Sequence, residues 1–240
     1  MLHLGIDDTD ITGSPGTNQL ARRLADRLPP GCHATIILRH QLLDDPRVPY
    51  TSQNGSASIG VECGRGFDRG ALLVMLRREM AAWFVIGSDP GLCIAEQVPE
   101  EVVRFGRRCQ RELLSQADAR HVAAAAGIFL EGLGGTEGGV IGALAAVGLL
   151  AGGDDGRVIH RPGWEWPDHF AGPHPIPAVL ARGVDVVRDA RTGVEVAAGT
   201  VDVGKHLRPS YRQGKVVLFV EPDNGVGAVD ASAWRAVKLP

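Results

Sequence analysis

Three carboxylates stand close together near the start of the chain. Asp7, Asp8 and Asp10 follow a short apolar run, Leu2–Ile6, which predicts a buried strand that ends at the acids. Carboxylates this close repel one another unless a cation neutralises them. Mg²⁺ prefers a few such oxygens together with water and phosphate oxygens. The cluster therefore predicts a Mg²⁺ site, and the alternative is a solvated acidic turn that caps the next segment.

A Gly-rich segment is the second candidate for chemistry. It precedes a small-residue helix predicted over Val140–Leu150, and its candidate nucleotide-binding residues are Gly134, Gly135, Thr136, Gly138 and Gly139. Glycines let backbone N–H groups turn toward an anion, and a helix N-terminus adds a favourable dipole. The segment is neither a Walker A loop nor a dinucleotide-binding fingerprint. It predicts phosphate binding, and the alternative is a flexible loop before a tightly packed helix.

Thr17 stands at the entrance of a helix predicted over Asn18–Leu28, one loop away from the three acids. Leu20, Leu24 and Leu28 form the apolar stripe of that helix. A hydroxyl in this place can accept a phosphoryl group or bind a metal ion. The alternative is that Thr17, or Asn18, is simply the N-cap of the helix.

A polar run, Pro49–Ser56, lies beside a predicted strand and suits contacts with a base or a phosphate. Its candidate substrate contacts are Thr51, Ser52 and Asn54. Arg39 and Arg47 flank the run and are candidates for contact with a phosphate. The same run is equally compatible with an ordinary surface loop.

The remaining periodicities predict a mixture of strands and helices. Predicted strands are His33–Leu42, Ser56–Glu62, Leu92–Ala95, Gly183–Arg188, Gly193–Ala198 and Lys215–Glu221, and predicted helices are Phe67–Phe84 and a long one opening at Pro99. Val102, Phe105, Cys109 and Leu113 form the apolar stripe of the long helix. This mixture predicts an α/β or α+β fold in two subdomains.

Composition shifts after about Gly152, which divides the 240 residues into 1–152 and a β-rich segment, 153–240. The net charge of −3 argues against a strongly basic nucleic-acid-binding surface. The N-terminus lacks a signal peptide, and the longest apolar run, Val140–Gly153, is too short to span a bilayer. These features predict a cytoplasmic protein without a membrane partner.

The four cysteines are far apart in the sequence and have no zinc-ligand spacing. They predict buried, reduced thiols, because free cysteine is among the most buried residue types. The sequence indicates no oligomeric state.

Several motifs in order resemble one known family. They are Gly5-Ile6-Asp7-Asp8-Thr9-Asp10 followed by Thr17, the Pro49–Ser56 run, Asp89-Pro90-Gly91, the segment Gly138–Gly148, and Pro173–Leu180 before Arg182-Gly183. Together they resemble archaeal agmatidine synthetase, which uses ATP to attach agmatine to the wobble cytidine of an isoleucine tRNA. The resemblance extends over roughly residues 1–185.

This resemblance implies an ATP-binding, kinase-like α/β domain over residues 1–152. It implies the remainder of a ferredoxin-like subdomain, followed by the C-terminal β-rich segment, over residues 153–240. It implies that Asp7, Asp8 and Asp10 hold Mg²⁺, that the Gly-rich loop lies by the phosphates of ATP, and that Thr17 is autophosphorylated. The family also has an OB-type domain and a zinc ribbon that grip tRNA, and neither is expected here. Where the family carries two basic residues in its substrate loop, Thr51–Gly55 is neutral.

The sequence therefore predicts an ATP- and Mg²⁺-dependent phosphoryl-transfer or ligase enzyme. Its acceptor is expected to be a small molecule, with an amine as possible co-substrate, and tRNA binding is expected to be weak or to need a partner. The alternative is a non-catalytic nucleotide- or RNA-binding accessory module.

Overall fold

A computed structural model describes residues 1–48, 53–164, 169–223 and 233–238. The contacts within the chain divide it into two compact units, residues 1–152 and 153–240. Each unit is described by itself.

The first unit is built on an antiparallel sheet with the strand order β5-β4-β1-β3-β2. Its strands are β1 (Leu2–Asp7), β2 (Cys32–Gln41), β3 (Gly55–Cys63), β4 (Gly91–Ala95) and β5 (Phe129–Gly132). The residues of β1 are almost fully buried, because β1 lies in the middle of the sheet. The predicted strand Leu2–Ile6 is therefore found, and it ends at the first acid.

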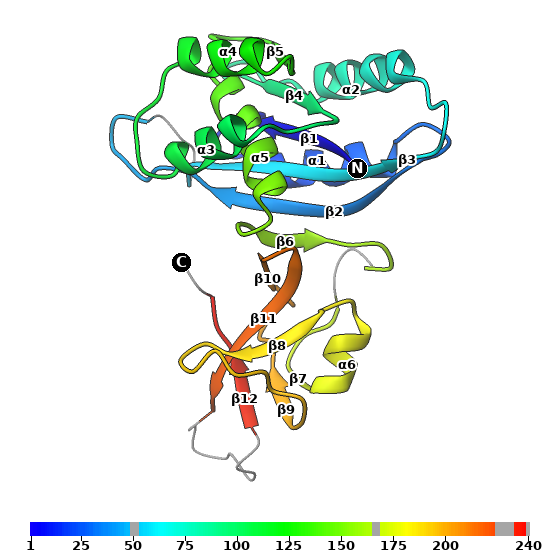
Figure 1. The fold of residues 1–240 in the computed structure, drawn as a ribbon, viewed down its shortest axis with the longest axis vertical. Helices are drawn as coiled ribbons and strands as arrows, with labels where there is room; N and C mark the ends of the chain where they lie inside the picture. Colours follow the sequence, from blue (N-terminus) through cyan, green and yellow to red (C-terminus); the bar gives the residue numbers. More distant parts are fainter. Residues whose placement is uncertain (49–52, 165–168, 224–232, 239–240) are drawn as a thin grey trace. The chain divides into compact units, whose positions relative to one another are not determined.

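Helices cover this sheet (Figure 1). They are α1 (Thr17–Asp26), α2 (Arg69–Trp83), α3 (Glu100–Cys109), α4 (Gln116–Ala125) and α5 (Val140–Gly152). Helix α5 packs against β1, β3 and β4, and α3 packs on α5. A Cβ on Gly5 would lie 2.0 Å from the carbonyl oxygen of Ala143, and one on Gly148 would lie 2.1 Å from that of Val102. Glycine at these two positions permits the close approach of α5 to β1 and α3.

The long helix predicted from Pro99 is wrong in its extent. Helix α3 ends at Cys109, and a second helix, α4, begins at Gln116 behind a capping box made by Ser115 and Asp118. In a capping box, the side chain of each of the two residues accepts a hydrogen bond from the backbone N–H of the other, and this favours the start of a new helix. Leu113, expected on the apolar stripe, lies between the helices and is 51% exposed.

Helix α2 matches its prediction closely, with Asp68 as the N-cap and Leu72, Met75 and Met80 buried. One charged residue on it is also buried. Glu79 is 3% exposed, and its carboxylate pairs with the guanidinium groups of Arg23 and Arg78. A buried carboxylate is stable only when it is paired in this way.

The second unit is a small, mainly β structure with a short helix. Its elements are β6 (Arg157–His160), β7 (Pro173–Pro175), α6 (Ile176–Ala181), β8 (Val186–Asp189), β9 (Thr200–Asp202), β10 (Ser210–Arg212), β11 (Lys215–Pro222) and β12 (Ala233–Ala236). Strand β11 pairs with β8, β10 and β12. The strand predicted at Gly193–Ala198 is wrong, because this segment makes only an isolated bridge between Arg188 and Glu195.

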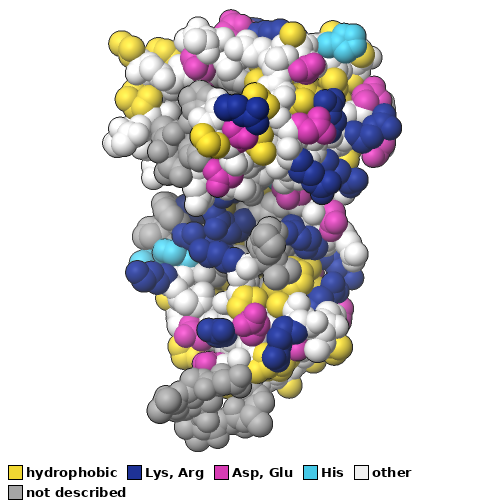
Figure 2. Space-filling model, turned by 90° about the vertical axis from the view of Figure 1, so that its left-hand side faces the viewer, with side chains coloured by type: hydrophobic (Ala, Val, Ile, Leu, Met, Phe, Trp, Pro, Cys, Tyr) yellow, Lys and Arg dark blue, Asp and Glu magenta, His cyan; other side chains and the backbone are white. Residues whose placement is uncertain are grey.

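Charged side chains of both signs share the surface of the first unit (Figure 2). Arg108 pairs with Glu112 at 2.8 Å, Arg77 with Glu131 at 2.8 Å, and Arg69 with Glu96 at 3.2 Å. Much of the positive charge in this unit is therefore offset locally. Over the described residues, no helix is both long enough and apolar enough to cross a membrane.

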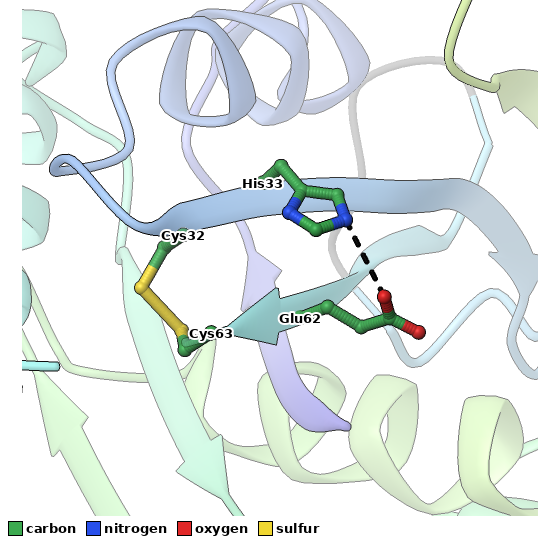
Figure 3. Close-up of a disulfide and its surroundings, with 4 residues drawn as sticks. All are labelled: Cys32, His33, Glu62 and Cys63. Carbon is green, nitrogen blue, oxygen red and sulfur yellow. Dashed lines mark ion pairs between the residues drawn. A yellow bond between two sulfur atoms is a disulfide. The ribbon is translucent and has the colours of Figure 1, made fainter. Parts of the chain in front are cut away.

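The prediction of four reduced thiols is wrong for two cysteines. Cys32 and Cys63 form a disulfide that joins β2 to β3, with a Cα–Cα distance of 4.1 Å (Figure 3). The sheet register places the two residues directly opposite each other. They are 31 residues apart in the sequence, and this spacing alone does not predict that they pair. The neighbouring pair, His33 and Glu62, lies within 3.4 Å. Cys93 and Cys109 are free and buried, as predicted.

Candidate functional site

One end of the first unit's sheet gathers the segments that carry the predicted chemistry. In an antiparallel sheet, the end of one strand lies beside the start of its neighbours. Asp7 at the end of β1 pairs with Gly91 at the start of β4, and Gly91 pairs with Gly132 at the end of β5. Gln41 at the end of β2 pairs with Gly55 at the start of β3. The loops that leave these strand ends therefore meet at the same end of the sheet.

A cavity of about 560 Å³ opens at this end of the sheet. The acids, part of the Gly-rich loop and part of the predicted substrate loop line it together: Asp7, Asp8, Asp10, Thr17, Arg47, Asn54, Thr136 and Gly138. Apolar side chains complete the lining, among them Leu42, Leu43 and Leu114. Its volume is within the range of small-ligand sites, which is roughly 300–1,000 Å³. Segments that are far apart in the sequence thus share one pocket.

Asp7 and Asp8 are half-buried at the edge of the cavity, and both have a raised pKa. Burial, together with the charge of Asp8, raises the pKa of Asp7 to about 7. Burial and the charge of Asp89 raise the pKa of Asp8 to about 6. Asp8 also has a φ of 51°, a left-handed conformation that is uncommon outside glycine. Acids held in this way lower their energy by taking up a proton or a cation.

Asp10 has the structural role that the sequence offers as the alternative to metal binding, because it caps the segment that follows the acids. Its carboxylate accepts hydrogen bonds from the Thr17 N–H at 3.2 Å and from the Thr17 hydroxyl at 2.9 Å. It thereby satisfies a donor at the N-terminus of α1, which would otherwise lack a partner. The N-cap residue is Gly16, so the assignment of the cap to Thr17 or Asn18 is wrong.

The Thr17 hydroxyl is buried in a short chain of hydrogen bonds. Thr9 donates its hydroxyl to the Thr17 oxygen at 3.0 Å, and Thr17 donates to Asp10. Thr17 is 7% exposed, yet it lines the cavity. Its hydroxyl proton is therefore already directed at the carboxylate of Asp10, a second residue that lines the cavity.

The described part of the chain contains no group of three His, Cys, Asp or Glu side chains arranged to hold a metal ion. Asp7, Asp8 and Asp10 line one cavity without forming such a group, and Asp10 is engaged by Thr17. The Mg²⁺ site of these residues stays a prediction.

The Gly-rich loop divides into packing residues and cavity residues. A Cβ on Gly134 would lie 2.6 Å from the ring of Phe84, and one on Gly139 would lie 2.5 Å from the carbonyl oxygen of Asp89. The Gly139 N–H also donates to that carbonyl at 2.8 Å. Neither glycine is among the residues that line the cavity. Glycine at both positions therefore permits close packing against the protein, and the contact of Gly134 and Gly139 with a nucleotide stays a prediction.

Gly138 and Thr136 are the predicted nucleotide-binding residues that line the cavity. Gly135 has a φ of 58°, and its neighbour is the Asp89 carboxylate. A residue with a side chain would be strained there.

The predicted substrate residues are only partly gathered at the cavity. Arg47 lines it and forms a two-point pair with Asp45. Asn54 also lines it, and its amide donates to the Leu43 carbonyl at 2.8 Å. Arg39 is outside the cavity lining and donates to Gln53 at 2.9 Å, so its predicted contact with a substrate phosphate is not favoured. Thr51 and Ser52 are outside the described residues.

Sequence reasoning missed Asp89, Glu112 and Gln116, which all line the cavity. In the sequence, Asp89 stands out only as part of the family-like motif Asp89-Pro90-Gly91, to which the sequence assigns no role. The strand that follows it pairs with β1, which brings it beside Asp8. Glu112 precedes the last stripe residue of the predicted long helix, Leu113, and in the structure it lies between α3 and α4, whereas Gln116 begins α4.

Solved structures resemble this fold. A crystal structure of a tRNA fluorescent labelling enzyme matches 61% of this chain with a TM-score of 0.55 and 26% identity. Apo TiaS, the agmatidine synthetase of an isoleucine tRNA, matches 61% with a TM-score of 0.51 and 25% identity. The complex of TiaS with this tRNA and ATP matches with a TM-score of 0.54 and 24% identity. The chain is structurally similar to agmatidine synthetase.

The similarity confirms the resemblance predicted from the motifs, and it is partial. This chain spans about a third of the matched structures, 35% of the labelling enzyme and of apo TiaS. No family model matches the chain, and no curated protein matches it in sequence.

Proposed function

We propose that this chain is an ATP- and Mg²⁺-dependent enzyme, either a phosphoryl transferase or a ligase. Its reaction takes place in the cavity of the first unit. The observation that carries the proposal is the joint lining of one pocket by the acids, Thr17 and the Gly-rich loop. The solved complex of TiaS with ATP supports it, because that structure resembles this chain in fold. The kinase-like and ferredoxin-like assignment belongs to the same proposal.

The residues at the cavity fit a magnesium–nucleotide complex. Mg²⁺ is usually bound through one or two carboxylates together with phosphate oxygens and water. Asp7 and Asp8 supply two carboxylates with raised pKa values, and Asp89 adds a third charge beside Asp8. The metal would neutralise charge on the phosphates. The apolar side chains of the lining suit a nucleobase, since bases bind apolar surfaces well.

Thr17 is proposed as the first phosphoryl acceptor. A bond would form between its hydroxyl oxygen and the terminal phosphorus of ATP, while the bond from that phosphorus to the bridging oxygen breaks and ADP leaves. The hydroxyl proton would pass to Asp10, which already accepts it at 2.9 Å. Positioning and charge stabilisation account for most of such catalysis.

A second acceptor is proposed to be an oxygen on a small molecule, which would bond to the terminal phosphorus of ATP while ADP leaves. An amine nitrogen would then bond to the carbon that bears this oxygen, while the carbon–oxygen bond breaks and phosphate leaves. tRNA binding is proposed to be weak or to depend on a partner. The protein has a net charge of −3, and the residues Thr51–Gly55 carry no basic side chain. Binding to nucleic acid gains much of its affinity from neutralised phosphates. Filter binding to total tRNA at physiological salt tests this, and tight binding there would return the protein to tRNA modification.

The test of the enzyme proposal is incubation of the purified protein with ATP, with and without Mg²⁺. We expect ATP consumption only with Mg²⁺, and one added phosphate that peptide mass spectrometry maps to Thr17. The variant Thr17→Ala should lack that phosphate. ATP binding without consumption or phosphate transfer would favour a non-catalytic nucleotide-binding module, a role compatible with a chain that matches only part of TiaS.

A further inference from the structure

Asp89 lies where three loops of the cavity meet. Its N–H donates to the Asp8 carbonyl at 3.2 Å, and its own carbonyl accepts from the Gly139 N–H at 2.8 Å. These two backbone bonds connect the acidic loop after β1 to the Gly-rich loop before α5. Asp89 itself belongs to the segment that precedes β4.

The side chain of Asp89 holds the middle of the Gly-rich loop. One carboxylate oxygen accepts the Thr136 N–H, and the other accepts the Thr136 hydroxyl at 2.8 Å. A Cβ on Gly135 would lie 1.9 Å from the first oxygen, so the carboxylate occupies the inside of the turn. The Thr136 carbonyl in turn accepts from Gln116 of α4 at 2.9 Å. The loop is thus held from two sides.

This arrangement differs from an ordinary helix cap. A cap satisfies donors of its own helix, whereas Asp89 satisfies donors of a loop 47 residues away in the sequence. Thr136 and Gly138 of that loop line the cavity together with Asp89 and Asp8. A loop that is ordered before its ligand arrives costs less affinity at the moment of binding.

We propose that Asp89 is a positioning residue, which acts through Thr136 to hold the Gly-rich loop in the form that receives the phosphates of the nucleotide. This inference rests on the proposed function, because it takes ATP as the ligand of the cavity. The Asp89 carboxylate acts before binding, by holding Thr136 and with it the middle of the Gly-rich loop. Its effect is therefore confined to the phosphate end of the ligand.

Calorimetric titration with ATP and with adenosine, both with Mg²⁺, tests the proposal on four variants: Asp89→Ala, Asp89→Asn, Thr136→Val and the double variant Asp89→Ala with Thr136→Val. We expect Asp89→Ala to lower ATP affinity about tenfold, because the Gly-rich loop would then have to be ordered when ATP binds. Adenosine affinity should stay within about twofold of the wild type, since the base end is untouched. Asp89→Asn keeps one acceptor oxygen and should recover part of the loss.

The double variant separates action through Thr136 from an independent effect. If Asp89 acts through Thr136, the double variant binds ATP no more weakly than Asp89→Ala alone, because coupled residues do not add. Asp68→Ala is the matched control: it removes a carboxylate that accepts a single backbone N–H, from Ala71, outside the cavity lining. Equal losses for ATP and adenosine, additive losses, or an unchanged ATP affinity in Asp89→Ala would overturn the proposal.

Amide hydrogen exchange, measured without nucleotide, tests the positioning role of Asp89 independently of the proposed ATP-dependent function. Residues 134–139 should exchange faster in Asp89→Ala and Thr136→Val than in the wild type. If the wild type binds no ATP, the proposed function fails, and exchange alone then decides whether Asp89 holds the loop. Unchanged exchange in both variants would overturn the positioning role whatever the ligand is.

Discussion

The carboxylate of Asp7 lies against the Cα of Gly142, so closely that a Cβ on Gly142 would stand 1.8 Å from the Asp7 Oδ2 atom. Gly142 is in the first turn of α5, and Asp7 ends β1. The absence of a side chain on the helix is therefore what gives the acid its place at the edge of the cavity.

The variant Gly142→Ala should displace Asp7 from this place. We expect it to weaken Mg-ATP binding strongly and to cost roughly 1–3 kcal/mol of stability, the usual penalty for overpacking. Gly148→Ala is the control. Gly148 is also in α5, and its Cβ would meet the Val102 carbonyl oxygen at 2.1 Å, but Gly148 does not line the cavity. Calorimetry should show intact ATP binding in folded Gly148→Ala. Equal ATP affinity in both variants would contradict the account.

The stability of the protein without metal should fall as the pH rises. The pKa of Asp7 is raised to about 7 in the folded protein, whereas an Asp in the unfolded chain titrates near 4. The folded state therefore binds more protons between these values, so its stability is greatest below about pH 4 and declines through pH 7 as far as Asp7 is concerned. Asp8, with a pKa of about 6, acts in the same direction.

Urea unfolding at pH 5 and pH 8 in the presence of a chelator measures this dependence. We expect Asp7→Asn to flatten the decline, because the amide does not titrate. The account is contradicted if the wild type is more stable at pH 8 than at pH 5 and Asp7→Asn has the same pH dependence. Asp7 is then not held in the protonated form.

Thr17 should contribute to stability through its hydroxyl as well as serving as an acceptor. Thr17→Val keeps the shape but leaves Asp10 without its hydroxyl donor and Thr9 without its acceptor. We expect a loss of about 1–3 kcal/mol, the cost of unsatisfied buried polar groups, and a smaller loss for Thr17→Ser, which keeps the hydroxyl. Denaturant unfolding compares the two variants. A loss for Thr17→Val that is no larger than the loss for Thr17→Ser would contradict the role given to the hydrogen bonds.

The disulfide between Cys32 and Cys63 should be found in the purified protein. Thiol titration of the denatured, unreduced protein should give two free thiols, from Cys93 and Cys109. The double variant Cys32→Ser with Cys63→Ser should lose about 2–4 kcal/mol. Four free thiols in protein taken directly from cells would mean that the pair is reduced there. Disulfides are rare in the cytosol, so the redox state of the pair in cells also tests the predicted cytoplasmic location.

Periodicity and local signals are sufficient for much of the first unit. The stripe of Leu20 and Leu24 predicts α1, and the apolar run before the acids predicts β1, because both patterns depend on neighbours in the sequence. The break between α3 and α4 escapes a prediction from the apolar stripe alone, because its signal is the capping box at Ser115.

Long-range pairing is what the sequence could not supply. Asp89 reaches the cavity because β4 pairs with β1, and Cys32 meets Cys63 because of the register of β2 and β3. Capping of the next segment by the acids is the alternative that the sequence predicts, whereas its assignment to Asp10 depends on the fold of the loop. The types of the candidate residues are evident from the sequence, whereas their division between cavity-lining and packing positions, as for Gly138 and Gly139, depends on the fold.

Calorimetric titration of ATP into the wild type and Asp8→Asn, each with and without Mg²⁺, tests the central claim most directly. Asp8 lines the cavity together with Asp7 and Asp89, and its conversion to an amide changes the charge with little change of shape. The account predicts Mg²⁺-dependent ATP binding by the wild type, and at least about a tenfold loss of that affinity in a folded Asp8→Asn variant. Equal, Mg²⁺-independent affinity in the two proteins, or no binding by the wild type, would contradict it.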